Sequence, residues 1–121
     1  MKNYFPFLFL FLLVLSCTKY QSETLKFLSS DGVNEISVSA TQSAPMDPLK
    51  VTVKVKVPKG EKTFFVELSA SKLNTENVKM EWLTNNKGTL TLTHADGQKK
   101  VMNVNLNDDK IHVIQEIQNP H

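Results

Sequence analysis

The chain has 121 residues, of which 40% are hydrophobic and 21% are charged, and its 14 basic residues nearly balance its 12 acidic ones. This balance leaves no basic excess for binding nucleic acid, and every basic residue is Lys, so bidentate guanidinium contacts to phosphate are absent. The single cysteine excludes a framework of disulfides within the chain.

The first element along the chain is an apolar run from Tyr4 to Leu15, which follows the positive charge of Lys2. Its length of about a dozen residues is typical of a signal-peptide core. An ordinary secretory signal is one interpretation, although Val14 and Ser16 only loosely meet its need for small residues before the cut. A permanent membrane anchor is another, but the run falls short of the ~20 residues with which a helix crosses a bilayer.

The end of this run carries a second signal, the sequence Leu-Val-Leu-Ser-Cys at residues 13–17. These residues resemble a bacterial lipobox, the site at which a prolipoprotein is lipidated on its cysteine and then cut just before it. The resemblance implies that residues 1–16 are removed as a signal peptide and that Cys17 carries the lipid. It also accounts for a lone thiol in an exported chain.

A lipid anchor implies a place in the cell envelope. Bacterial lipoproteins carry a diacylglyceryl thioether on this cysteine and commonly a third chain on its amine. Two or three acyl chains hold a protein stably at a membrane, whereas one chain binds reversibly. Thr18, rather than Asp, follows Cys17, and the resemblance then favours the outer membrane or the cell surface over the inner membrane.

The mature chain has the length of one domain. Removal of residues 1–16 from the 121 leaves 105 residues, enough to bury a single core. We interpret residues 17–23, which are short and polar, as the lipidated N-terminus and a tether. Residues 24–121 then form the folded domain.

Hydrophobic residues recur with a period of two through most of this domain, as they do in half-buried strands. The clearest strand is residues 49–57, where Val alternates with Lys and Thr. Asp96 and Gly97 give the strongest signal for a two-residue hairpin turn. The predicted strands lie around residues 25–28, 33–41, 49–57, 64–70, 78–82, 90–92, 102–106 and 111–113.

This pattern predicts an all-β fold, a single antiparallel β-sandwich of seven to eight strands. An immunoglobulin-like topology is our leading prediction, with Trp82 as the buried tryptophan of a middle strand, and a small β-barrel is the alternative. The paired cysteines of immunoglobulin domains are missing and Tyr20 falls in the tether, so the similarity is architectural.

The chain lacks the residue sets of an enzyme or a metal site. Cys17 is assigned to the lipid, His94 and His112 are expected at the surface, and His121 ends the chain. No His pair has the spacing of a zinc site, and Asp108 with Asp109 is more simply a solvated turn than a calcium site. We therefore predict a protein that is not an enzyme and takes no metal or cofactor.

Two surfaces are candidates for binding a partner. The first is a stripe of lysines on and beside the strand at residues 49–57, which would contact anionic headgroups, glycans or an acidic protein. In the alternative interpretation these lysines keep the sheet soluble and protect its edge. The lysines are Lys50, Lys54, Lys56, Lys59 and Lys62.

The second candidate surface is apolar. Phe65, Val101 and Ile114 fall on the phase opposite to the core residues of their strands. If they converge, they form a protein-binding patch; otherwise they belong to strands buried on both faces or are boundary positions.

These observations predict a membrane-anchored bacterial lipoprotein whose β-sandwich is a non-catalytic binding module of the cell envelope. Its partners are the membrane, through the anchor, and a protein or a glycan, but no nucleic acid. The alternatives are a periplasmic carrier or chaperone for an apolar ligand, which needs an unfilled cavity, and a structural component of the envelope.

Overall fold

The computed structural model describes residues 20–107 and 110–119. The predictions for the leader at 1–16, for Cys17, for Asp108 with Asp109 and for His121 lie outside these residues. The described chain forms nine strands. They are β1 (Tyr20–Gln21), β2 (Leu25–Leu28), β3 (Glu35–Gln42), β4 (Leu49–Val57), β5 (Gly60–Leu68), β6 (Val78–Thr84), β7 (Lys87–Thr93), β8 (Lys99–Asn105) and β9 (His112–Gln118).

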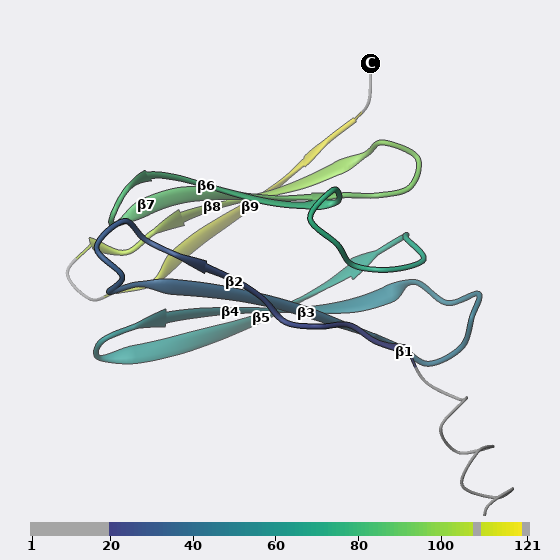
Figure 1. Ribbon diagram of the computed structural model, residues 1–121. Helices are drawn as coiled ribbons and strands as arrows, with labels where there is room; N and C mark the ends of the chain where they lie inside the picture. The colour runs from purple at the N-terminus through teal and green to yellow at the C-terminus, as the bar shows by residue number, and fades with distance from the viewer. Residues whose placement is uncertain (1–19, 108–109, 120–121) are drawn as a thin grey trace, which may run out of the picture.

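The strands form two antiparallel sheets that pack face to face (Figure 1). We call them sheet A, with the order β1-β3-β4-β5 and β2 also paired to β3, and sheet B, with the order β6-β7-β8-β9. The predicted β-sandwich is confirmed. The alternative of a small barrel is wrong, because the two sheets stay separate rather than closing on each other.

The topology differs from the immunoglobulin-like one that we predicted. In that fold, consecutive strands are divided between the two sheets. Here β2 to β5 follow one another across sheet A, and β6 to β9 follow one another across sheet B. The physical reason is that neighbouring strands of each sheet are joined by short turns, while only the longer connection at residues 69–77 crosses to the other layer.

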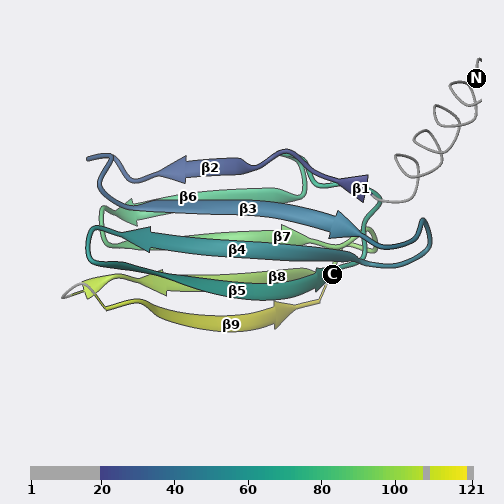
Figure 2. The same cartoon turned by 90° about the horizontal axis from the view of Figure 1, so that it is seen from below.

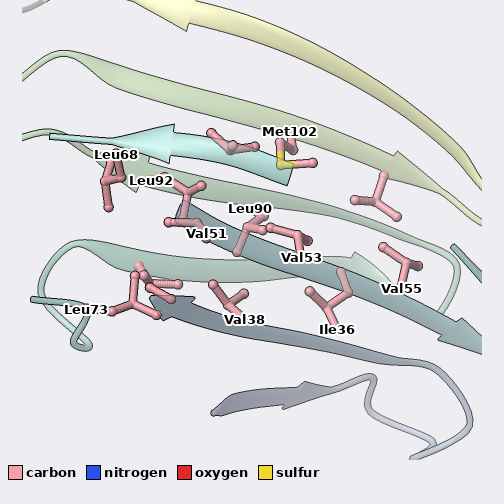
Figure 3. Packing of buried hydrophobic residues seen from close by; sticks show 14 of the residues in the cluster. Ile36, Val38, Val51, Val53, Val55, Leu68, Leu73, Leu90, Leu92 and Met102 are labelled. Carbon is pink, nitrogen blue, oxygen red and sulfur yellow. The ribbon is translucent and has the colours of Figure 1, made fainter. Parts of the chain in front are cut away.

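The core lies between the sheets and is built by strict alternation along the strands. Strand β4 spans the predicted residues, and its five inward side chains are almost completely buried. Figure 3 shows Val51, Val53 and Val55 of this strand facing Leu90 and Leu92 of the opposite sheet. Each such side chain contributes about 1.5–3 kcal/mol when it leaves water.

Trp82 packs against this core from β6 but is only half-buried, so the prediction of a buried tryptophan holds only in part. It lies opposite Gly88 of β7. A Cβ atom at Gly88 would lie 3.2 Å from the indole of Trp82 and would collide with the end of Met80. The backbone carbonyl oxygen of Glu81 would also lie 3.0 Å from this Cβ, so close packing favours glycine at residue 88.

The domain begins earlier than predicted. Tyr20 and Gln21, which we expected in the tether, form β1 and pair with Gln42 and Thr41 of β3. The hydroxyl of Tyr20 also accepts a hydrogen bond of 3.2 Å from the backbone N–H of Leu73. These contacts place Tyr20 and Gln21 in the folded domain.

The two ends of the sandwich are distinct (Figure 2). The end at which β1 begins, here the β1 end, holds the loop at 43–48 and the turn at 94–98. The opposite end, here the Asn34 end, holds the turns at 29–34 and 85–86, which are joined by the buried side chain of Asn34. The Asn34 end therefore lies far from Tyr20, the first residue that the structure describes.

The turn at 94–98 lies where a hairpin was predicted, but it is longer than two residues. Gly97 has a positive φ of 94°, and its N–H donates to the carbonyl of His94 over 3.0 Å. The side chain of His94 accepts a 2.9 Å hydrogen bond from the backbone N–H of Ser69, at the end of β5. His94 thus joins the two sheets at the β1 end.

Candidate functional site

The candidate site is a groove on the outer face of sheet B, close to the Asn34 end, with a volume of about 280 Å³. Strand pairing builds it from two cross-strand rows of outward-facing side chains. One row is Thr89, Asn103 and Ile114, and the other is Lys87, Asn105 and His112. The alternation that fills the core with apolar residues therefore also places these side chains on one outer surface.

A β-bulge completes one wall of the groove. The register between β6 and β7 shifts between Trp82 and Thr84, so Leu83 has no residue directly opposite it. Bulges redirect side chains at the ends of strands. Leu83 lines the groove and is 69% exposed.

The groove has a polar floor between aliphatic walls. On the floor, the hydroxyl of Thr89 donates to the side-chain oxygen of Asn103 over 3.2 Å. The wall residues Leu83 and Ile114 are exposed by 69% and 64%, a large apolar area to leave in water. Binding sites commonly combine apolar contact area with a few polar groups that fix orientation. The arrangement can bind a ligand that offers both.

The predicted lysine stripe lies on the other sheet and is not strongly positive. Lys50, Lys54 and Lys56 do share the outer face of β4. However, Lys56 lies directly between Glu35 and Glu61, and Lys50 lies opposite Glu67, so opposite charges alternate across the sheet. Such pairs stabilise a sheet by a few tenths of a kcal/mol, up to about 1 kcal/mol.

The other two predicted lysines are not part of the same face. Lys59 lies in the turn between β4 and β5. Lys62 pairs with Val55 and is thus on the inward phase of β5, with its Nζ atom 5.7 Å from the ring centre of Phe64. The five lysines therefore do not form one binding surface.

The predicted apolar residues do not converge either. Phe65 is 77% exposed on the outer face of sheet A, whereas Ile114 is on the outer face of sheet B. Val101 is only 7% exposed, because it lies in the interior strand β8 between Thr91 and Glu116. The prediction of one patch is wrong, and Ile114 alone belongs to the groove.

Sequence reasoning missed most of the groove. It singled out Ile114 and His112, but not Leu83, Asn103 or Asn105. The two Asn residues alternate with Val104 in β8, which is a signal for the outer face. Leu83 carried no such signal, because its position depends on the bulge.

The part of the chain that the structure describes contains no cluster of metal-ligating side chains. No three His, Cys, Asp or Glu side chains of residues 20–107 and 110–119 lie close enough to hold a metal ion. Within the same residues, no helix has the length and apolar character of a membrane span.

The pKa of Asp31 is lowered, chiefly by the Ser29 hydroxyl that donates to it over 2.6 Å and then by the N–H of Val33.

Comparisons of the chain with protein-family models, with curated proteins and with solved structures found no match.

Proposed function

We propose that this protein is a lipid-anchored bacterial lipoprotein of the cell envelope, and that its β-sandwich is a non-catalytic module which binds a partner protein through the groove on sheet B. The observation that carries the proposal is the position of the groove, which lies toward the Asn34 end, whereas Tyr20, the first described residue, lies at the β1 end. Cys17 precedes β1 by three residues, a reach of roughly 10 Å. The anchor therefore holds the β1 end beside the membrane.

The groove lies toward the other end of the sandwich. Its two rows of side chains come from the first residues of β7 and β9 and from the last residues of β8. These residues lie next to the turn at 85–86, to which Asn34 is hydrogen-bonded. Strand β7 runs from Thr93 near the β1 end to Lys87 in the groove and thus spans about 20 Å. A groove at this distance from the lipid is open to a partner in the aqueous envelope.

The chemistry of the groove favours an extended protein segment. Its walls, Leu83 and Ile114, are aliphatic, whereas sugar rings are commonly held by stacking on aromatic rings. Its floor presents the amide side chains of Asn103 and Asn105, which pair with polar groups of a peptide. A glycan is the alternative partner.

The interior of the sandwich favours a binding module over a carrier. A carrier for an apolar ligand needs an unfilled cavity between its sheets. Here Ile36, Leu68 and Leu90 fill that space and are completely buried, as is Met102 at 1% exposure. A purely structural envelope component remains the second alternative, and it requires no partner at the groove.

Photo-cross-linking in cells tests the function of the groove. A photo-reactive residue at Ile114 should capture one protein in a saturable manner, and the same substitution at Phe65 should not, because Phe65 is exposed on the opposite sheet. Asn103→Ala should weaken the capture at Ile114 while the domain stays folded. Equal capture at Ile114 and Phe65, or none at either, would refute the groove as the binding site.

A further inference from the structure

Strand β9 is an open edge of sheet B. It pairs with β8 on one side, and no other strand of residues 20–107 and 110–119 pairs with its second side. An unpaired edge presents a row of backbone N–H and C=O groups that another strand can complete. The question is whether this edge is protected, as edges in soluble proteins usually are.

The other edges of the sandwich carry recognisable protection. Strands β1 and β2 are only two and four residues long. Strand β5 carries Glu61, Lys62 and Glu67, and β6 carries two charged residues and a bulge. Short edges, charges and bulges all discourage pairing with another chain. By contrast, β9 has seven residues with the sequence HVIQEIQ, in which Glu116 is the single carboxylate and neither Lys nor Pro occurs.

The inward face of β9 is also uncovered. Gln115 and Ile117 are on the phase that faces the core, since they pair with Met102 and Lys100. Both are nevertheless exposed, Ile117 by 64%. Figure 2 shows the cause, because β9 lies beyond β5 at the side of the sandwich and thus outside the cover of sheet A.

We propose that β9 pairs antiparallel with β9 of a second copy of this chain, about a two-fold axis at Gln115. This register uses all seven residues of the strand. On the inward face, Val113 lies opposite the partner's Ile117, and Gln115 lies opposite the partner's Gln115. The exposed Ile117 is thereby covered by an apolar side chain, twice by symmetry.

Charge also fits a second copy in this register. Glu116 lies opposite the partner's Ile114, and His112 lies opposite the partner's Gln118, so no like charges face each other. The pairing keeps the outer faces of both sheets on the same side, so the two grooves open in one direction. One strand per copy is a small interface, and the dimer is therefore expected to depend on concentration.

Disulfide cross-linking tests the register. The full-length chain with Cys17→Ser is purified in detergent, and a single cysteine is then introduced as Gln115→Cys or, as a matched control, Gln118→Cys. Residues directly opposite in an antiparallel pair have Cα atoms about 4.5–5.5 Å apart, within the range for a disulfide. Two copies of residue 118 lie six residues apart in this register, or about 20 Å.

We expect mild oxidation to convert most of the Gln115→Cys protein to a covalent dimer, and the Gln118→Cys protein to remain monomeric. Equal yields of dimer from both variants would show random collision and would overturn the proposal. So would the absence of a Gln115→Cys dimer at high protein concentration.

A second experiment measures the association itself. In sedimentation velocity the chain with Cys17→Ser should form dimers as its concentration rises, and Ile117→Lys should raise the concentration for half-dimerisation at least tenfold by placing a charge in the pairing face. Phe65→Lys changes another exposed apolar residue, on the outer face of sheet A, and should leave the concentration for half-dimerisation unchanged. Equal effects of the two variants, or a protein that is monomeric throughout, would contradict pairing through β9.

Discussion

The side-chain amide of Asn34 donates a 2.7 Å hydrogen bond to the backbone carbonyl of Asn85, which joins the β2–β3 turn of sheet A to the β6–β7 turn of sheet B. Asn34 is only 5% exposed, and its backbone N–H donates to the hydroxyl of Ser29. The buried Asn34 thus connects the two sheets at the Asn34 end, next to the groove, together with the backbone N–H of Asp31, which donates to the side-chain oxygen of Asn85 over 3.0 Å.

Asn34→Ala should therefore destabilise the domain. The substitution leaves the carbonyl of Asn85 without this donor, a loss of about 1–3 kcal/mol when the group stays buried. The free energy of unfolding from urea denaturation measures the effect. Asn107→Ala, at an exposed residue, is the control and should change stability by less than ~0.5 kcal/mol. Equal losses for the two variants would show that Asn34 does not connect the sheets.

Gly88→Ala should also lower stability, because a Cβ at this position would lie 3.0 Å from the backbone carbonyl oxygen of Glu81 and 3.2 Å from the indole of Trp82, besides displacing the end of Met80. Overpacking of a well-packed core costs about 1–3 kcal/mol. Gly60→Ala is a matched control, since nothing lies within 4 Å of its added Cβ and its φ is not positive. The thermal unfolding midpoints of the two variants, compared with that of the wild type, measure this loss of stability. A Gly88→Ala domain as stable as the wild type would contradict the packing of Trp82 described above.

Acid should weaken the turn at residues 29–34. The pKa of Asp31 is lowered in the folded state by the Ser29 hydroxyl and by the Val33 N–H. A lowered folded pKa means that the carboxylate stabilises the fold above its unfolded pKa, and that this contribution disappears as the pH falls through the folded pKa. Ser29→Ala removes the largest cause and should raise the pKa of Asp31 toward its ordinary value.

The titration of the Asp31 carboxyl carbon by NMR measures this pKa directly. In addition, Asp31→Asn should be less stable than the wild type at neutral pH, and the difference should shrink as the pH falls below about 4. A difference between the two proteins that does not change with pH would mean that the charge of Asp31 plays no part.

The positions of β2 and β4 were predicted correctly from the sequence, but β7 and β9, predicted at residues 90–92 and 111–113, span 87–93 and 112–118. The neighbours of each strand could not be predicted. Residues 49–57 alternate so strictly that the predicted strand coincides with β4. A period of two predicts on which face of the sheet a side chain lies, but it does not predict which strands pair. The consecutive order of β2 to β5 in sheet A and of β6 to β9 in sheet B therefore became known only from the strand pairing in the structure. Tyr20 was missed because a two-residue strand has no period.

The groove was only partly predictable for the same reason. Ile114 was identified because it is apolar on the outward phase of its strand. Its neighbours Asn103 and Thr89 come from other strands, and only the register brings them together. Val101 has the same phase as Ile114, yet it is buried because its strand lies inside the sheet instead of at the edge.

The lysines show a third limit of prediction from the sequence, which concerns the charge of a surface. Lys50, Lys54 and Lys56 were correctly placed on one face, but the charges beside them were unknown without the register. Glu35, Glu61 and Glu67 belong to neighbouring strands and lie opposite these lysines. Charge along one strand is therefore a poor guide to the charge of a sheet.

Fractionation of cells tests how the protein is held in the envelope. If the proposed lipid anchor is correct, Cys17→Ala should move the protein out of the membrane fraction, because acyl chains could no longer be attached at this residue. Cys17→Ser should behave in the same way, and Ser16→Ala should leave the protein at the membrane. Continued retention of the Cys17→Ala protein would point to an anchor other than lipid.

The most direct test of the central claim is mass spectrometry of the mature N-terminus, purified from the membranes of cells that express the full chain. A lipid-anchored module predicts an N-terminal peptide that begins at Cys17, with the added mass of two or three acyl chains. A chain that keeps residues 1–16, or that begins at an unmodified residue, would contradict it.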